Sequence, residues 1–161
     1  MILGAPPGWT LVEFDYSQIE LRILAMLSGD PEMKRAYQVG EDIHEKTGKR
    51  ILGLKELTKE LRKKAKAVNF GFAYGMGFKK FIEYARDSYH ITVSLREAKR
   101  TRGTFFELYA GLPHYHEKQR RIVRAQGYVR SPIGRMRHLG HINSEHQDER
   151  ARAERHAINA P

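Results

Sequence analysis

The sequence predicts a helix-rich α+β fold. Most of its 161 residues fall into segments in which apolar side chains recur every three or four positions, and several segments open on Ser, Thr or Asp, which favour helix N-termini. Two short segments, residues 10–15 and 127–139, instead indicate β structure. The sequence contains no repeat or low-complexity tract. Helices combined with a small amount of sheet are therefore expected.

The N-terminal elements are predicted to be a strand and two helices. After the turn-rich "APPGW", the segment "TLVEFD" is typical of a short buried strand that ends at Asp15. "SQIELRILAMLSGD" has apolar residues at helical spacing, and Ser28-Gly29-Asp30 ends that helix. Asp30-Pro31 starts a second helix, because aspartate caps helices and proline fits the first helical position. Asp15 is thus expected where a strand gives way to a helix.

The middle of the chain is predicted to be helical. "DIHEKTGKRIL" forms one helix, and Thr58 caps a longer one, "KELRKKAKAVNFGFAYG", whose two glycines loosen its far end. "FKKFIEYARDSY" forms a further helix. Ser94 and Glu97 have the spacing of a capping box at the start of "LREAKRTRGTFFELYAGL". Pro113 begins a helix that runs to Gly127.

The C-terminal elements are predicted to be a hairpin and a helix. "GYVRSPIGRMRHL" alternates around a Ser-Pro-Ile-Gly turn, which indicates a β-hairpin. "SEHQDERARAERHAINAP" is a charged helix that ends at a proline.

The composition indicates a polyanionic partner. Lys and Arg exceed Asp and Glu by 29 minus 19, which gives a net charge of +10, so nucleic acid or an acidic membrane surface is the expected partner class. The absence of cysteine excludes disulfides and thiolate metal sites. No run approaches the ~18 apolar residues of a membrane span, and no signal-peptide pattern opens the chain. We expect a soluble cytoplasmic protein that is not secreted.

A stripe of cations and aromatics follows the long central helix. Arg62, Lys66, Phe70 and Tyr74 are four residues apart, so each is rotated by about 40° and raised by about 6 Å from the one before. Two cations followed by an aromatic suit a nucleoside triphosphate, with its phosphates on the cations and its sugar or base on Phe70. The glycines after Phe70 and Tyr74 would let another chain or a base approach the backbone. The alternative is an amphipathic helix with solvated cations and core aromatics.

Asp15 is a candidate Mg²⁺ ligand. A carboxylate at the end of a buried strand is a usual place for such a ligand, and Mg²⁺ in phosphoryl transfer is held by one or two carboxylates plus substrate phosphates. The alternative is a loop aspartate that caps the next helix.

Two long segments of the chain resemble the family A DNA polymerases. "DYSQIELRILAMLSGD" at 15–30 resembles motif A of that family, and "RKKAKAVNFGFAYG" at 62–75 resembles motif B, in the family's order. "GEDIH" at 40–44, "GYVRSPIGRMR" at 127–137 and "AERHAINAP" at 153–161 also resemble family segments, so the resemblance covers almost the whole chain.

The resemblance implies a domain organisation. Helical fingers would be set on a partial antiparallel palm sheet. Residues 1–40 would be a palm segment with motif A, residues 41–126 the fingers with motif B, and residues 127–161 a returning palm and fingers segment that stops before motif C.

The resemblance also implies roles for the residues of motif A. Asp15 would bind both catalytic Mg²⁺ ions, together with the backbone carbonyl of Tyr16. Glu20 would be a steric gate that occupies the place of a ribose 2′-hydroxyl, and Gln18 would be a further nucleotide-binding residue. Ser17 and Glu20 also have the spacing of a helix capping box, which leaves a purely structural role open for Glu20.

In motif B, the resemblance implies that Arg62 and the catalytic Lys66 hold the triphosphate. Phe70 would pack on the sugar, and Tyr74 would lie beneath the template base or nascent base pair. His44 of "EDIH" matches a family histidine that contacts the phosphates, although a lone histidine would be taken for a surface residue.

Four further residues match family positions that face DNA or brace the active site. They are Gly75, Arg135, Arg155 and Asn159. Taken alone, the two arginines and the asparagine would be interpreted as solvated or ordinary polar helix residues.

The implied activity is DNA-templated DNA synthesis with two Mg²⁺ ions, primer-template DNA and dNTP, in a bacterial or phage-host cytoplasm. The second metal-binding carboxylate of the family, from motif C, is not found, and "HQDER" at 146–150 lacks the apolar neighbours of a buried strand. We therefore expect the isolated chain to be inactive, to expose apolar palm surface and to need the rest of the polymerase as its partner.

Two alternative functions remain open. A non-catalytic fragment that binds nucleic acid or nucleotide would explain the charge of +10 without Asp15. A single-subunit RNA polymerase would have a comparable motif B, but Glu20 argues against it, because an enzyme that uses ribonucleotides cannot close the 2′-hydroxyl pocket.

Overall fold

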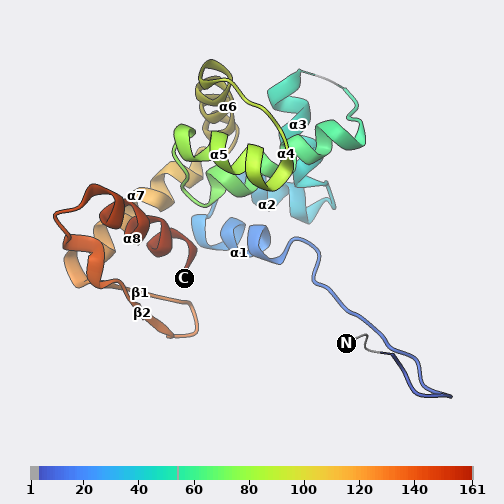
Figure 1. Cartoon of the computed structure of the whole chain (residues 1–161), viewed down its shortest axis with the longest axis horizontal. Coiled ribbons are helices and arrows are strands. Elements are labelled where there is room, and N and C mark those ends of the chain that lie inside the picture. The colour runs from blue at the N-terminus through green and yellow to red at the C-terminus, as the bar shows by residue number, and fades with distance from the viewer. Residues whose placement is uncertain (1–3, 54, 161) are drawn as a thin grey trace.

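Helices dominate the computed structural model, which describes residues 4–53 and 55–160 (Figure 1). The helix-rich α+β prediction is confirmed, since each predicted helix is present beside a small antiparallel sheet. The elements are α1 (Ile19–Ser28), α2 (Pro31–Gln38), α3 (Ile43–Leu52), α4 (Lys59–Ala73), α5 (Phe78–Tyr89), α6 (Leu95–Leu108), α7 (Gly111–Gln126), β1 (Tyr128–Arg130), β2 (Met136–His138), the 3₁₀ helix η1 (Gly140–Asn143) and α8 (Gln147–Asn159). Among the described residues, no helix combines the length and apolar character needed to cross a membrane. Pro161, predicted to end the last helix, lies outside the described residues.

Local side-chain caps set the starts of four helices. The caps of α2, α3, α4 and α6 accept hydrogen bonds from backbone N–H groups within the next three residues, and they are Asp30, Asp42, Thr58 and Ser94. The predicted caps Asp30, Thr58 and Ser94 are confirmed. The capping box at Ser94 is half formed, because the carboxylate of Glu97 is paired with Lys64 of α4. Each such cap stabilises its helix by ~1 kcal/mol.

The start of α7 departs from the prediction. The helix begins at Gly111 rather than at Pro113, and its N-cap Ala110 offers no side-chain cap. The N–H of Gly111 instead donates to Oδ2 of Asp30 over 2.8 Å. An added Cβ at Gly111 would lie 2.9 Å from Cα of Asp30, so this contact requires glycine. The cap comes from another part of the chain, which is why a local pattern could not place it.

The predicted C-terminal hairpin is confirmed. β1 and β2 pair antiparallel, with Val129 opposite Arg137. The N–H of Gly134 donates to the carbonyl of Ser131 over 2.9 Å and closes the turn. The φ of Gly134 is 87°, a conformation that residues with a Cβ rarely adopt.

The strand predicted at residues 10–15 is not formed, so that prediction was wrong. Residues 4–16, here called the N-terminal arm, contain no strand and project from α1 away from the helices (Figure 1). A strand needs a neighbouring strand for its backbone hydrogen bonds, and the sheet in the described part of the chain consists of β1 and β2. The large apolar side chains of the arm are exposed, as expected, with Phe14 91% and Trp9 76% accessible.

The helices α1 to α7, together with Ile158 of α8, enclose the main apolar core. α4 packs against α3, α5 and α6, and its Val68 and Phe72 are buried in this core. A second, smaller core lies between α7, β1, η1 and α8 around Val123 and Val129. Gly71 does not interrupt α4 as predicted, since the helix continues to Ala73. An added Cβ at Gly71 would lie 2.7 Å from Cδ2 of Phe81 on α5. Glycine at this position lets α4 and α5 pack closely.

Candidate nucleotide-binding site

The predicted stripe on α4 is present at the edge of the main core. Arg62 and Lys66 are exposed, whereas Phe70 and Tyr74 are half-buried. Nζ of Lys66 lies 5.8 Å from the ring centroid of Phe70, and the rings of Phe70 and Tyr74 are 5.8 Å apart. The aromatic side chains thus keep part of their surface accessible and continue the line of the two cations.

Asp42 orients the first cation of the stripe. Its Oδ2 lies 2.5 Å from Nη2 of Arg62, while its Oδ1 caps α3 by accepting from the N–H groups of His44 and Glu45. Burial raises the pKa of Asp42, but the hydrogen bonds from Arg62 and from these N–H groups outweigh burial and lower it below its usual value. Asp42 is therefore anionic at neutral pH.

His44 is buried, with 3% of its surface accessible, so a surface position is excluded for it. Its ring lies 5.7 Å from that of Phe70, and its Nδ1 is 2.9 Å from Nδ2 of Asn69. Burial is the main cause that lowers the pKa of His44 to about 4, with Arg62 and Lys66 adding to the effect against Asp42. His44 is thus neutral at physiological pH.

Glu20 lies in a cavity rather than in a helix cap. The N-cap of α1 is Gln18, which has a φ of 55° and makes no side-chain cap, so the capping box of Ser17 and Glu20 is not formed. Glu20 and Tyr74 instead line a cavity of about 320 Å³ where α1 and the end of α4 meet α7 and α8. Burial raises the pKa of Tyr74, and the nearby carboxylate of Glu20 raises it further.

Gln18 joins α1 to α2. Its Oε1 accepts a hydrogen bond from the hydroxyl of Tyr37 over 3.3 Å, and the guanidinium carbon of Arg22 lies 4.5 Å from the centroid of the Tyr37 ring. These contacts fix the residue at which the N-terminal arm enters α1. The nucleotide-binding role of Gln18 stays a prediction.

Three of the four predicted DNA-facing residues meet at the C-terminal end of α8. Gly75 has a φ of 77°, and an added Cβ there would lie 2.6 Å from Cδ1 of Ile158. Asn159 lines the cavity that contains Glu20 and also borders a cavity of about 280 Å³ with Arg135. Arg155 is half-buried on α8 and lines neither cavity.

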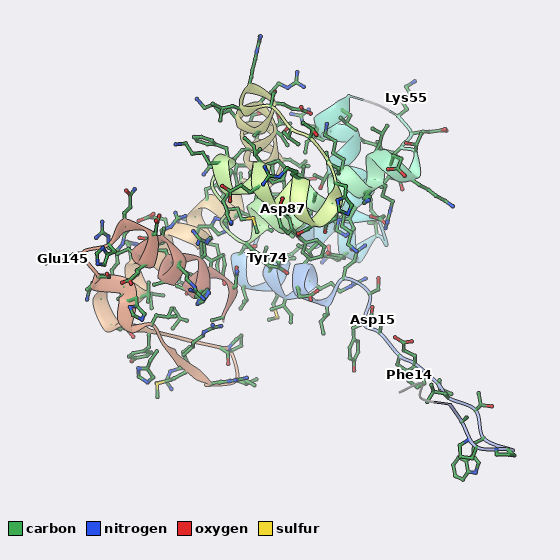
Figure 2. All side chains as sticks on the ribbon, in the orientation of Figure 1. Phe14, Asp15, Lys55, Tyr74, Asp87 and Glu145 are labelled. Carbon is green, nitrogen blue, oxygen red and sulfur yellow. The ribbon has the colours of Figure 1, made fainter. Side chains whose placement is uncertain are left out.

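Asp15 and Tyr16 lie on the N-terminal arm, apart from the stripe. Figure 2 shows Asp15 on this arm and Tyr74 among the helices. Within residues 4–53 and 55–160, no group of three or more His, Cys, Asp or Glu side chains is arranged to hold a metal ion. The exposed carboxylate of Asp15 and the carbonyl of Tyr16 are nevertheless the hard oxygen donors that Mg²⁺ prefers. These two residues fit part of a magnesium site.

Asn69 and Thr47 are residues that the sequence reasoning missed. Both are buried and hydrogen-bonded beside His44. The available signal was a polar amide, Asn69, among the apolar positions of an otherwise amphipathic helix, since buried amides need partners.

Comparison with known proteins gives consistent matches over the whole chain. The family model described as DNA polymerase family A matches residues 1–161. DNA polymerase I of Streptococcus pneumoniae serotype 4 is 40% identical over 161 residues, which covers 96% of this chain and 18% of that protein. The thermostable DNA polymerase I of Thermus thermophilus is 36% identical over 159 residues, covering 98% of this chain and 18% of that protein.

A solved structure has a similar fold. It is the POL domain of an M. smegmatis polymerase in complex with DNA primer-template and dNTP, with a TM-score of 0.79 and 35% identity over 91% of this chain and 25% of that one. The present chain thus spans about a fifth of the length of the curated relatives named above.

Proposed function

Because the chain belongs to DNA polymerase family A, we propose that it supplies the nucleotide-binding surface and one metal-binding carboxylate of a DNA-templated DNA polymerase. The observation that carries this proposal is the α4 stripe, in which two accessible cations are followed by two partly accessible aromatic rings. Primer-template DNA and dNTP, which the M. smegmatis structure contains, are the proposed partners. The boundaries of palm and fingers at residues 40 and 126 stay predictions.

The dimensions of the stripe suit a deoxynucleoside triphosphate. Arg62 and Tyr74 are separated by about 18 Å along the helix axis at 1.5 Å per residue, on the scale of an extended nucleotide. The phosphates would bind Arg62 and Lys66, the sugar would pack on Phe70 and the base pair would lie against Tyr74. Glu20, in the cavity beside Tyr74, would fill the space of a 2′-hydroxyl.

The chain's own residues would act mainly by positioning and by neutralising charge. In the proposed reaction, a primer 3′-hydroxyl attacks the α-phosphate of the dNTP, and pyrophosphate leaves. Lys66 and Arg62 would stabilise negative charge that develops on the phosphates, and Asp42 would hold the guanidinium of Arg62 in place before the nucleotide arrives. A guanidinium that is already held in place does not have to move when negative charge develops on the phosphates.

Asp15 and the carbonyl of Tyr16 would hold Mg²⁺. When bound, the ions would supply charge neutralisation and activation of the attacking hydroxyl. Gly75, Arg135, Arg155 and Asn159 are proposed to face the DNA or brace the site, and the end of α8 brings Gly75, Arg135 and Asn159 close together.

A second candidate function is binding of nucleic acid without catalysis. It is favoured by the position of Asp15 on the arm, apart from the stripe, and by the net charge of +10. The two functions differ in their dependence on metal. A pure binder holds DNA equally well with Asp15→Ala and without Mg²⁺.

Lys66→Ala tests the nucleotide-binding surface. In titrations of the 161-residue chain with a fluorescent dNTP, this change should weaken binding about 10- to 100-fold, since hydrogen bonds to charged groups contribute ~1.5–3 kcal/mol. Binding of primer-template DNA should change by about twofold. Lys118→Ala removes an exposed lysine of α7 and serves as the matched control. Equal losses for both ligands would instead support the solvated-cation alternative.

A further inference from the structure

A cluster of four polar side chains lies buried where α3, α4 and α6 meet. Thr47 and Tyr109 have no accessible surface, Asn69 has 1% and His44 has 3%. Burying an amide or hydroxyl without a hydrogen bond costs about 1–3 kcal/mol of folding free energy in proteins. Each polar group of the cluster is therefore expected to have a hydrogen-bond partner. The cluster therefore has a defined set of donors and acceptors.

The hydrogen bonds of the cluster orient the Asn69 amide. The Tyr109 hydroxyl lies 2.8 Å from Oγ1 of Thr47, and Oγ1 of Thr47 lies 2.9 Å from Oδ1 of Asn69. Oγ1 of Thr47 also lies 2.7 Å from the carbonyl oxygen of Ile43, so its single proton does not by itself fix the amide. The Ile43 carbonyl does, because it can only accept: Nδ2 of Asn69 lies 3.5 Å from it and 2.9 Å from Nδ1 of His44. The opposite orientation would place the amide oxygen against the carbonyl oxygen of Ile43, which is repulsive.

The orientation of Asn69 determines which nitrogen of His44 carries the proton. An amide nitrogen only donates, so Nδ1 of His44 must accept, and the single proton of the neutral imidazole then resides on Nε2. Within the described part of the chain, Nε2 of His44 makes no hydrogen bond, yet it is not among the fully buried side-chain atoms that lack one. Nε2 therefore keeps some contact with solvent. Nε2 of His44 is therefore available to a ligand.

The proton position matters because His44 is neutral. Burial and the cations Arg62 and Lys66 lower its pKa to about 4, against the opposite effect of Asp42. A neutral imidazole binds a phosphate oxygen only through its N–H, because phosphate oxygens of a nucleotide are acceptors. With the proton on Nδ1, Nε2 would repel the same ligand.

We propose that Asn69 is a positioning residue that keeps the proton of His44 on Nε2, so that His44 donates a hydrogen bond to the phosphates of a nucleotide bound along the α4 stripe. The phosphate as ligand rests on the proposed function, whereas the position of the proton does not.

Nitrogen NMR of the ¹⁵N-labelled 161-residue chain tests the position of the proton directly. At pH 7.5, long-range ¹H–¹⁵N spectra should show a protonated Nε2 and an unprotonated Nδ1 for His44, with the signals assigned by their loss in His44→Gln. Ionised Asn69→Asp offers only acceptors and should place a proton on Nδ1, either by exchange of the tautomer or by forming the imidazolium. Asn143→Asp, the same change at an exposed residue of η1, should leave it on Nε2. A protonated Nδ1 in the wild-type chain, or no change in Asn69→Asp, would overturn the proposal.

A double-mutant cycle tests the link to the ligand. His44→Ala and Asn69→Leu should each weaken binding of dNTP about tenfold, and Asn69→Leu should cause no further loss once His44 is alanine. A loss from Asn69→Leu that persists without His44 would overturn the positioning role. If the NMR result is as expected but His44→Ala leaves dNTP affinity unchanged, the phosphate contact is overturned while the proton position stands. The wild-type spectrum establishes the proton position even if the Asn69→Leu variant does not fold.

Discussion

The two motif-bearing regions of the molecule differ in what supports them. Motif B lies on α4, which packs against three other helices. Its Arg62 is paired with Asp42, and its buried Asn69 is hydrogen-bonded to Thr47 of α3. The start of motif A lies on the N-terminal arm, whose apolar side chains are exposed and whose backbone has no strand partner within residues 4–53 and 55–160. Two motifs that are equally clear in the sequence can therefore differ in how many contacts hold their backbone in place. A motif on a helix brings its own backbone hydrogen bonds, whereas a motif on a strand depends on a neighbour.

Limited proteolysis should show the largest difference between the two regions. Chymotrypsin should cleave after Trp9, Phe14 or Tyr16 about 1000-fold faster than after buried Phe72 or Tyr109. Cleavage in the core requires an opening that costs at least ~4 kcal/mol, whereas the arm needs none. The measurement is the rate of appearance of each fragment by mass spectrometry. Cleavage in the arm as slow as that after Phe72 and Tyr109 would show that the arm is folded against the helices in solution.

The pH dependence of stability should arise in the helical part. His44 and His116 are buried, and burial lowers the pKa of each to about 4, against an ordinary value of ~6.5. Between these values the unfolded chain binds more protons than the folded one, so the free energy of unfolding should decrease as the pH falls from about 6.5 to 4. Each histidine should contribute on the order of 3 kcal/mol. The arm contains no histidine.

His116→Gln isolates one of the two contributions. Nε2 of His116 donates to the carbonyl of Ala73 over 2.8 Å, and a glutamine amide can make the same bond without titrating. Urea unfolding at pH 7 and pH 5 should show a smaller pH difference for this variant than for the wild type. An unchanged difference would remove His116 from the explanation.

Gly71→Ala should destabilise the helical part by up to about 2 kcal/mol. Alanine normally stabilises a helix interior over glycine by ~1 kcal/mol, but here its Cβ would lie 2.7 Å from the Phe81 ring, and overpacking costs ~1–3 kcal/mol. Gly103→Ala, in α6 with no atom within 4 Å of the added Cβ, is the matched control and should be stabilising. Phe14→Ala on the arm should change stability by less than about 0.5 kcal/mol. Thermal unfolding of the three variants measures all of these effects.

Glu20→Ala should have the smallest effect, and on selectivity rather than on stability. If Glu20 fills the space of a 2′-hydroxyl, its loss should improve binding of ribonucleotide relative to deoxynucleotide by up to about tenfold, or ~1.4 kcal/mol. The melting temperature should hardly change, since Glu20 takes no part in a helix cap. The ratio of Kd values for ATP and dATP is the measurement. A ratio unchanged within about twofold would leave Glu20 without a role as a gate.

The sequence predicts an element correctly wherever the interaction that stabilises it is local. Thr58 and Asp30 could be recognised as caps because each bonds to an N–H three residues away. The hairpin and the α4 stripe were predicted for the same reason, since turn residues and a four-residue spacing act within one element. The roles of the site residues, including Mg²⁺ binding at Asp15, stay predictions.

The errors of the sequence reasoning concern contacts between distant segments. The strand at residues 10–15 failed because alternation of side chains does not provide a partner. Gly71, expected to loosen α4, instead accommodates the Phe81 ring of another helix. The buried His44 finds its hydrogen-bond partner in Asn69, 25 residues along the chain. No local pattern contains these neighbours.

The hydrogen bond between Asp30 and Gly111 has a consequence for the modularity of the chain. It joins positions 81 residues apart at 2.8 Å, so the polypeptide leaves α1 and returns to α7 at almost the same point in space. The segment between them, from α2 to α6, therefore begins and ends at neighbouring points in the structure. Segments whose ends lie close together tolerate transplantation and circular permutation. The stretch that bears the α4 stripe is therefore suited to being exchanged as a unit between relatives, with Asp30 and Gly111 as the junction to preserve.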